Sequence, residues 1–315
     1  MDAQVKSSVE VAQLIRRLPS CVTYLRICCN VLDVRFPLWL PDVAAGLRKR
    51  CPDLEILIIE KVFFQEQPCD VQIRTQDEKK FHKWIPPSDE EGSELFCISC
   101  ASEDSALDQF APEYFPKKLH VLSLRESLFI TSHFTSRLDV LIPQLKVLDL
   151  SPSLCITEDI VPFFSRVSNL TELYLGRCPV TSKGIEKILQ TVENLKILDL
   201  ENTGVCFKIF LALKRYGRSL VELYIGGTLV EDSFLAFEND NTFENLRVLC
   251  LRSTCVTPRG LVELLDLYPS LCSVNVSQCN VEEIWIDERY FYMHEKLIFN
   301  NTIYCDHFRK NAYRM

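Results

Sequence analysis

One short apolar pattern recurs through most of the chain and constrains its fold more than any other feature. Segments with apolar residues at the first, fourth and sixth places begin at Leu119, Leu145, Leu170, Leu195, Leu220, Leu246 and Leu271. The starts are 25 or 26 residues apart. A fixed period of this length is typical of a solenoid, in which each unit buries its apolar side against the next. The repeat therefore predicts one stack of similar units instead of independent globular domains.

Each unit begins with a predicted strand. In "LKILDL", residues 195–200, alternate side chains of an extended segment point to opposite faces. Leu198 and Leu200 are expected in the core, whereas Ile197, Asp199 and Glu201 are expected on the opposite face of a parallel sheet. Corresponding residues of neighbouring units should then form columns across that face, because parallel strands lie about 4.8 Å apart.

A helix is predicted after each strand and turn. Thr181 and Thr257 are suitable N-cap residues, and Pro258 suits the first helical position, where its missing N–H is not needed. Apolar residues follow at helical spacing: Ile185, Ile188, Leu189 and Val192. The fold class is therefore α/β, a solenoid with a curved parallel sheet on its concave face and helices on its convex face.

Weaker copies extend the array toward the N-terminus. Apolar segments begin at Val22, Leu54 and Leu95, which brings the predicted strands to ten. The longest interval contains an insertion at about 65–93, whose end, "PPSDEEGS", has the composition of a loop. Residues 9–18 match the helix of a repeat, so they are either an N-terminal cap or the remnant of a unit whose strand is absent.

The pattern weakens near the C-terminus, so the array is assigned to residues 1–281 and a cap or tail to 282–315. The segment after 281 is rich in aromatic residues, and Trp285, Phe291 and Phe299 are expected to shield the last repeat. The alternative is a partner-binding tail with a basic end. Its basic residues are Arg309, Lys310 and Arg314.

Composition narrows the classes of partner and the cellular location. A net charge of −8 disfavours nucleic acid, since binding to phosphates needs clustered Lys and Arg. No signal peptide and no long apolar span are recognisable, so membrane association is not expected. Fifteen cysteines without a secretory signal indicate free thiols and a cytoplasmic or nuclear location. The lone Cys97-x-x-Cys100 pair has no second ligand pair at zinc spacing, and no cofactor is expected.

The repeats resemble the cysteine-containing leucine-rich repeats of the F-box/leucine-rich-repeat (Fbxl) family. The resemblance rests on the period, on the Cys or Thr position after the strand, and on helices such as "VTSKGIEKIL" (180–189) and "VTPRGLVELL" (256–265). The Cys-Pro pair in "LRKRCPDLEIL" (47–57) also matches the family pattern. The likeness extends to about residue 281.

The resemblance implies the substrate-recognition part of an SCF-type E3 ubiquitin ligase, with a target protein held on the concave face. In that family an F-box of about fifty residues binds the adaptor Skp1, but no F-box fits the residues before the first predicted strand at Val22. Contact with Skp1 and cullin is therefore expected only if a longer form supplies an F-box. The alternative is a cytosolic leucine-rich-repeat scaffold or inhibitor outside the ubiquitin pathway.

The candidate protein-binding residues are the polar side chains of the predicted concave face. Tyr174 and Tyr224 should flank Asp199, since tyrosine offers a large rigid contact area at binding hot spots. Acidic residues surround them and two arginines border the patch, which favours a basic target protein or peptide. The full set is Asp149, Glu172, Tyr174, Arg177, Asp199, Glu201, Glu222, Tyr224 and Arg252.

An enzyme is the competing class, and the sequence offers it little support. The chain has five histidines, none in the central columns of the predicted sheet, and no nucleophile elbow, zinc-binding helix or phosphate-binding glycine loop. We therefore expect no catalytic residues.

Overall fold

The computed structural model describes residues 14–29, 44–61, 70–75, 82–83, 115–125, 142–152, 164, 167, 169–232, 243–279, 281 and 297–298. The chain forms two compact units, Met1–Cys155 and Ile156–Met315. Both are built from short strands linked in chain order by turns and helices.

The first unit contains six described strands. They are β1 (Val22–Cys29), β2 (Ile56–Lys61), β3 (Asp70–Thr75), β4 (His82–Lys83), β5 (Val121–Ser123) and β6 (Val147–Asp149). Their order is β4-β3-β1-β2-β5-β6. The strands β1, β2, β5 and β6 pair in parallel, as the repeat predicts. However, β3 pairs antiparallel with β1, and β4 pairs antiparallel with β3.

The antiparallel strands belong to the insertion, whose role the sequence leaves open. Both β3 and β4 lie inside residues 65–93, and β3 occupies the otherwise open edge of β1. An unpaired edge of this kind is a site of aggregation, so pairing it stabilises the end of the stack. The insertion therefore supplies an edge cap. The "PPSDEEGS" segment and residues 9–13 of the predicted N-terminal cap lie outside the described residues.

The strand predicted at Leu95 lies outside the described residues. Within the described part of the chain, β2 pairs directly with β5, with Leu57 opposite Leu122.

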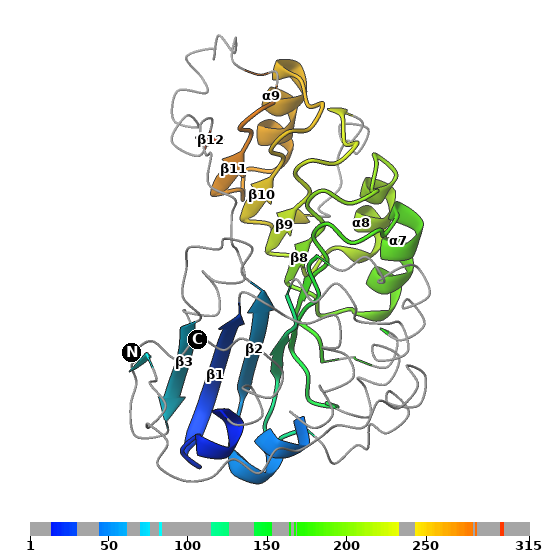
Figure 1. Ribbon diagram of the computed structural model, residues 1–315. Coiled ribbons are helices and arrows are strands. Elements are labelled where there is room, and N and C mark those ends of the chain that lie inside the picture. The colour runs from blue at the N-terminus through cyan, green and yellow to red at the C-terminus, as the bar shows by residue number, and fades with distance from the viewer. Residues whose placement is uncertain are drawn as a thin grey trace. The chain divides into compact units, whose positions relative to one another are not determined.

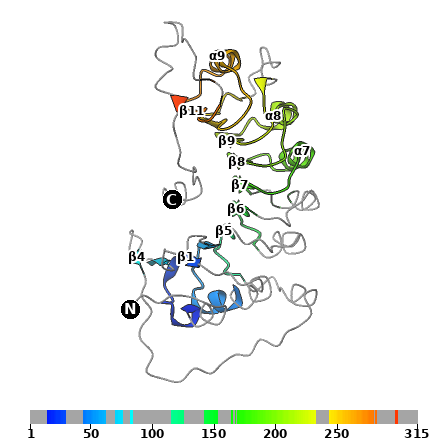
Figure 2. The ribbon, with the colours of Figure 1, turned by 45° about the horizontal axis from the view of Figure 1, so that its top comes forward.

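The second unit contains three described helices and six strands. The strands are β7 (Glu172–Tyr174), β8 (Ile197–Asp199), β9 (Glu222–Tyr224), β10 (Val248–Cys250), β11 (Ser273–Asn275) and β12 (Leu297–Ile298). The helices are α7 (Ser182–Thr191), α8 (Ile209–Tyr216) and α9 (Pro258–Leu267). Figure 1 shows β8 to β11 side by side, and Figure 2 shows the helices on the opposite side of this unit from the strands.

The register of the second unit places equivalent leucines opposite one another. Leu173 pairs with Leu198, Leu198 with Leu223, and Leu249 with Val274. All of these side chains are buried. Burial of each is worth roughly 1.5–3 kcal/mol, so the core is a continuous ladder that stabilises neighbouring repeats together.

The helices confirm the sequence-based caps. The hydroxyl of Thr181 accepts a hydrogen bond from the Gly184 N–H at 3.4 Å, and that of Thr257 accepts from Gly260 at 3.2 Å. Pro258 stands at the start of α9. By contrast, α8 begins after Lys208, which makes no side-chain capping bond. The buried face of α7 includes Ile185, Ile188 and Leu189, as predicted.

A short strand follows the predicted end of the array. Strand β12 pairs in parallel with β11, with Leu297 opposite Val274. Trp285, Phe291 and Phe299, predicted to form the cap, lie outside the described residues, as does the basic end. The fold class itself is confirmed: the chain is an α/β leucine-rich-repeat solenoid, and in its second unit the parallel strands lie on one face and the helices on the other.

Candidate protein-binding site

Three consecutive strands of the second unit carry most of the candidate residues. Tyr174 of β7 pairs with Asp199 of β8, and Asp199 pairs with Tyr224 of β9. Two residues earlier, Glu172, Ile197 and Glu222 are paired in the same way. The predicted columns across the sheet are therefore present, and Asp199 lies between the two tyrosines.

The tyrosines bind carboxylates of their own strands. The Tyr174 hydroxyl donates to Glu172 Oε2 at 2.9 Å, and the Tyr224 hydroxyl donates to Glu222 Oε2 at 2.5 Å. Tyr174 and Tyr224 are only 1% and 4% exposed. The expectation that this face presents both rings openly to a partner is therefore wrong. Each ring lies buried along the sheet, and its hydroxyl holds a glutamate in place.

Burial shapes the electrostatics of this cluster. Desolvation raises the pKa of Glu172 above its ordinary value of 4.5, and the charge of Glu222 adds to the effect. The hydrogen bond from Tyr174 and the charge of Lys196 oppose it. Burial and the neighbouring Glu222 carboxylate also raise the pKa of Tyr224, so its phenol remains a donor. The carboxylates Glu172, Asp199 and Glu222 thus form one negative cluster, in which Asp199 and Glu222 are half-buried and reachable from solvent.

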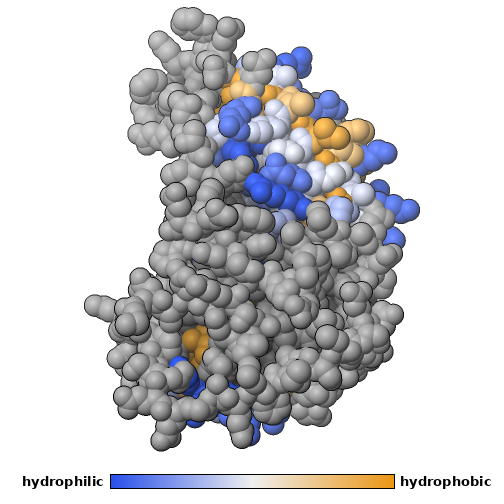
Figure 3. Space-filling model, in the orientation of Figure 1, coloured by the Kyte–Doolittle hydropathy of each residue, from blue (hydrophilic) through white to orange (hydrophobic). Residues whose placement is uncertain are grey.

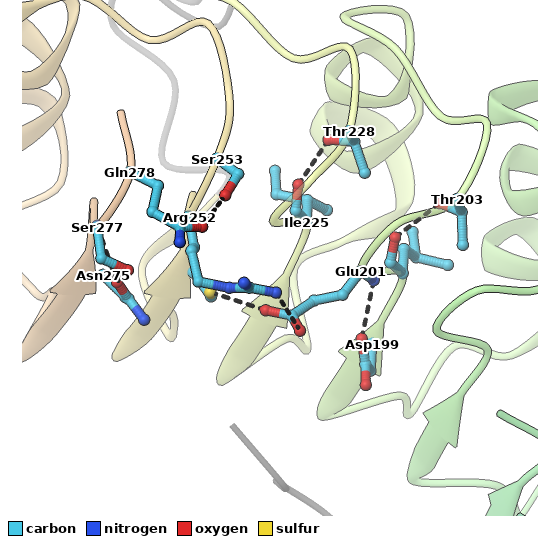
Figure 4. Close-up of polar contacts among 12 residues, drawn as sticks. Asp199, Glu201, Thr203, Ile225, Thr228, Arg252, Ser253, Asn275, Ser277 and Gln278 are labelled. Carbon is cyan, nitrogen blue, oxygen red and sulfur yellow. Dashed lines mark hydrogen bonds and ion pairs between the residues drawn. The ribbon is translucent and has the colours of Figure 1, made fainter. Parts of the chain in front are cut away.

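A second polar group lies beside this cluster and is held by its own contacts. Asp199 Oδ1 accepts from the Glu201 N–H at 2.9 Å. The Glu201 carboxylate accepts from Cys250 Sγ at 3.0 Å and lies 3.7 Å from Arg252 Nη2. Figure 4 shows Glu201 and Arg252 extended toward one another across the strand between them. The ion pair neutralises Glu201 locally, whereas Asp199 and Glu222 are partly accessible to solvent.

Glycines leave room for the side chains of Glu201 and Asp199 to extend across the neighbouring strands. A Cβ on Gly226 would lie 3.0 Å from Glu201 Oε1 and 3.0 Å from the Arg252 carbonyl oxygen. A Cβ on Gly176 would lie 3.4 Å from both Asp199 carboxylate oxygens. Gly176 and Gly226 occupy the positions equivalent to Glu201 in the repeats before and after it. A glycine on each side of Glu201 was the signal in the sequence.

The remaining candidates differ in position. Asp149 belongs to the first unit, where its carboxylate is buried and accepts from the Ser123 hydroxyl and from the N–H and hydroxyl of Ser151. These bonds give Asp149 a structural role in linking β5 to β6. Arg177 is exposed at the turn after β7, with a φ of 59°, and its N–H donates to the Glu201 carbonyl oxygen.

The positive φ at Arg177 belongs to a column of equivalent turn residues. Asn202, Gly227, Ser253 and Gln278 follow it with φ between 55° and 65°. Backbone N–H groups of this column donate to the next repeat, as from Asn202 to Gly226 and from Gly227 to Arg252. The column fixes the end of each strand and therefore the spacing of the candidate side chains.

The described residues contain no group of three or more His, Cys, Asp or Glu side chains arranged to hold a metal ion. Within that same part of the chain, no helix is long and apolar enough to cross a membrane.

The fold and this face define the class of protein. It is a leucine-rich-repeat solenoid, an architecture whose stacked strands typically serve as a protein-binding surface rather than a catalytic one. No protein-family model matches the chain.

Known proteins resemble the chain in sequence and in structure. Over 212 residues, or 65% of its length, it is 24% identical to tubulin-folding cofactor E from Arabidopsis thaliana. That match spans 39% of the relative, so the chain corresponds to less than half of that protein. Among solved structures, an internalin from Listeria monocytogenes aligns with a TM-score of 0.46 at 15% identity, over 94% of this chain and 64% of the internalin.

Proposed function

We propose that the sheet face of the second unit is a protein-recognition site that holds a basic segment of a target protein, and that the chain itself is not an enzyme. The observation that carries this proposal is the cluster of Glu172, Asp199 and Glu222 on adjacent strands, with Arg252 committed to Glu201. A Lys or Arg side chain placed at Asp199 would meet two half-exposed carboxylates. It would also relieve the repulsion between Glu172 and Glu222.

The burial of the two tyrosines changes their proposed contribution. Because both hydroxyls bind glutamates, Tyr174 and Tyr224 hold Glu172 and Glu222 in position for the target. Asp199 and Glu222 make the direct contacts, and Arg177 lies exposed at the border. Preorganised carboxylates bind a cation with little loss of side-chain entropy, which supports affinity and specificity.

Removal of one charge tests this site. Asp199→Asn keeps an oxygen that can accept from the Glu201 N–H but removes the negative charge. We expect capture of a basic target to weaken about tenfold, the equivalent of roughly 1.4 kcal/mol. Glu193→Gln is the matched control, because Glu193 is exposed in the turn between α7 and β8 and is not part of the acidic cluster. Equal target binding by folded Asp199→Asn and wild-type protein would contradict the proposal.

The cellular role that we favour is substrate recognition for an SCF-type ubiquitin ligase. The resemblance of the repeats to those of Fbxl proteins supports this role, and contact with Skp1 and cullin would require an F-box supplied by a longer form. The second candidate is a leucine-rich-repeat scaffold outside the ubiquitin pathway. The similarity to tubulin-folding cofactor E favours this candidate and suggests tubulin as a target to test.

Affinity purification followed by mass spectrometry distinguishes these roles. The chain and the longest natural form that contains it should be purified in parallel. Skp1 and cullin with the longer form alone would support the ligase role. Tubulin with both forms, in the absence of Skp1, would support the scaffold role. In either case, recovery of the target should depend on Asp199.

A further inference from the structure

A second surface of the same unit exposes large apolar side chains on the helix side. Phe207, Leu211 and Leu229 are 42%, 54% and 72% exposed and stand out as the exposed large hydrophobic residues of the described chain. Helix α8 already buries Ile209, Phe210, Ala212 and Leu213 against the core. The exposed residues are therefore additional to the face that stabilises the fold.

The three residues form one surface, which we call the outer patch. Phe207 lies in the turn before α8 and Leu211 lies four residues later, in the first turn of α8, so they lie on the same side. Leu229 belongs to the next repeat, but its N–H donates to the Val205 carbonyl oxygen, and its backbone forms an isolated parallel β-bridge with Cys206. Leu229 therefore lies beside the turn that contains Phe207. Figure 3 shows hydrophobic residues on the surface of the second unit with hydrophilic residues around them.

Basic side chains border the outer patch. Lys208 is exposed immediately before α8, Arg215 is exposed on α8, and Lys183 and Lys187 are exposed on α7. The two helices are adjacent, since the Ser182 hydroxyl accepts from the Cys206 N–H at 2.9 Å. This local excess of cations contrasts with the net charge of −8 for the whole chain.

The nearby acidic residues do not cancel this charge. Glu186 lies 3.9 Å from Arg215, a long contact between half-buried and exposed groups. Asp232 accepts from both the N–H and the hydroxyl of Thr257, which turns it toward α9. Glu231 is exposed beside Leu229 and Val230. Around the outer patch, the four exposed basic residues therefore outnumber Glu186 and Glu231, the two acidic residues that do not contact Thr257.

We propose that the outer patch binds an acidic amphipathic segment of a partner protein, in which Leu or Phe side chains are flanked by Asp or Glu. The apolar residues of the segment would cover Phe207, Leu211 and Leu229, and its carboxylates would meet Lys183, Lys208 and Arg215. This site is separate from the sheet face and would allow two different proteins to be held at once.

The charge pattern favours this partner over two others. A second copy of the chain would bring the same cations against one another across a symmetric contact, which is repulsive. An anionic membrane would meet the carboxylates of Glu186 and Glu231 along with the cations, and three apolar side chains offer little area for insertion. A peptide can place its own charges to match each of these groups.

Peptide selection tests the proposal directly. Random peptides of about 16 residues displayed on phage, long enough to cover two helices, would be selected on the full chain and on Leu211→Ser. Selected sequences should be enriched in Asp and Glu around Leu or Phe on the wild type, and this enrichment should be lost on the variant. Enrichment of basic peptides, equal enrichment on Leu211→Ser, or no enriched class on the wild type would overturn the proposal.

Affinity measurements with the most enriched peptide complete the test. Fluorescence anisotropy should show at least tenfold weaker binding to Lys208→Glu/Arg215→Glu, and a marked loss of affinity with added salt. Lys117→Glu, an exposed change in the first unit, is the matched control and should bind like the wild type.

The other possible occupants give distinct results. If phosphatidylserine vesicles sediment the wild type but not Lys208→Glu/Arg215→Glu, the patch is a membrane contact and the proposal fails. If the wild type self-associates in analytical ultracentrifugation and Leu211→Ser does not, the patch is a contact between copies and the proposal also fails. The proposal is supported if the wild type is monomeric, does not sediment with vesicles and binds the acidic peptide.

Discussion

At the scale of single residues, the buried carboxyl group of Glu172 makes the stability of the fold depend on pH. Its carboxyl group is buried, near Glu222, and has a raised pKa. The folded protein therefore holds this proton more tightly than the unfolded chain does. Above the ordinary value of 4.5, folding must either keep the group protonated or bury its charge, so the stability of the fold is reduced as pH rises through this window.

Glu172→Gln tests this linkage. Glutamine retains an oxygen that can accept from the Tyr174 hydroxyl but carries no charge. We expect the variant to be more stable than the wild type at neutral pH and similar to it at or below pH 4.5. Denaturant unfolding at a series of pH values measures the difference. A difference that does not change with pH would show that the charge of Glu172 is not responsible.

The described cysteines differ sharply in accessibility. Cys255 and Cys272 are exposed, whereas Cys51, Cys178, Cys250 and Cys279 are buried. Burial also raises the pKa of the Cys51 thiol to about 11, which keeps it protonated. Brief iodoacetamide treatment of the folded protein should modify Cys255 and Cys272 and spare the buried four. Peptide mass spectrometry reads the sites, and urea-unfolded protein, in which all six should react, is the control.

At the scale of elements, each helix depends on the turn that precedes it. The Thr181 hydroxyl caps α7, and loss of such a cap costs about 1 kcal/mol. Thr181→Ala should therefore lower the free energy of unfolding by about that amount, while Thr181→Ser should remain near the wild type. Because α8 has no side-chain cap, Lys208→Ala should have a smaller effect. Urea unfolding of the three variants would contradict this account if Lys208→Ala were the most destabilised.

At the scale of the whole molecule, stability comes from stacking of neighbouring repeats. Leu198 is buried between Leu173 and Leu223, and its truncation to alanine removes contacts on both sides. We expect Leu198→Ala to cost about 2–5 kcal/mol. Hydrogen exchange should show the largest loss of protection in β7, β8 and β9, with β1 and β2 much less affected. An equal loss across both units would show that the chain unfolds as one block.

Much of the fold was predictable because its cause is local and repeated. Apolar residues with a 25- to 26-residue period place Leu173 and Leu198 in one ladder, and the columns through Asp199 follow from strand alternation. The caps at Thr181 and Thr257 were predictable for the same reason. The antiparallel pairing of β3 with β1 was not predictable in this way, because the residues of β3 lie outside the repeat period.

The sequence by itself determined the class of fold and the order of side chains on the sheet, since both follow from periodicity along the chain. Only the tertiary structure decided that β3 closes the edge of β1 and that Tyr174 and Tyr224 turn inward onto glutamates. It also decided that Phe207, Leu211 and Leu229 meet on the outside. The solvent exposure of a side chain depends on contacts between segments far apart in the chain, and a repeating sequence pattern does not specify those contacts.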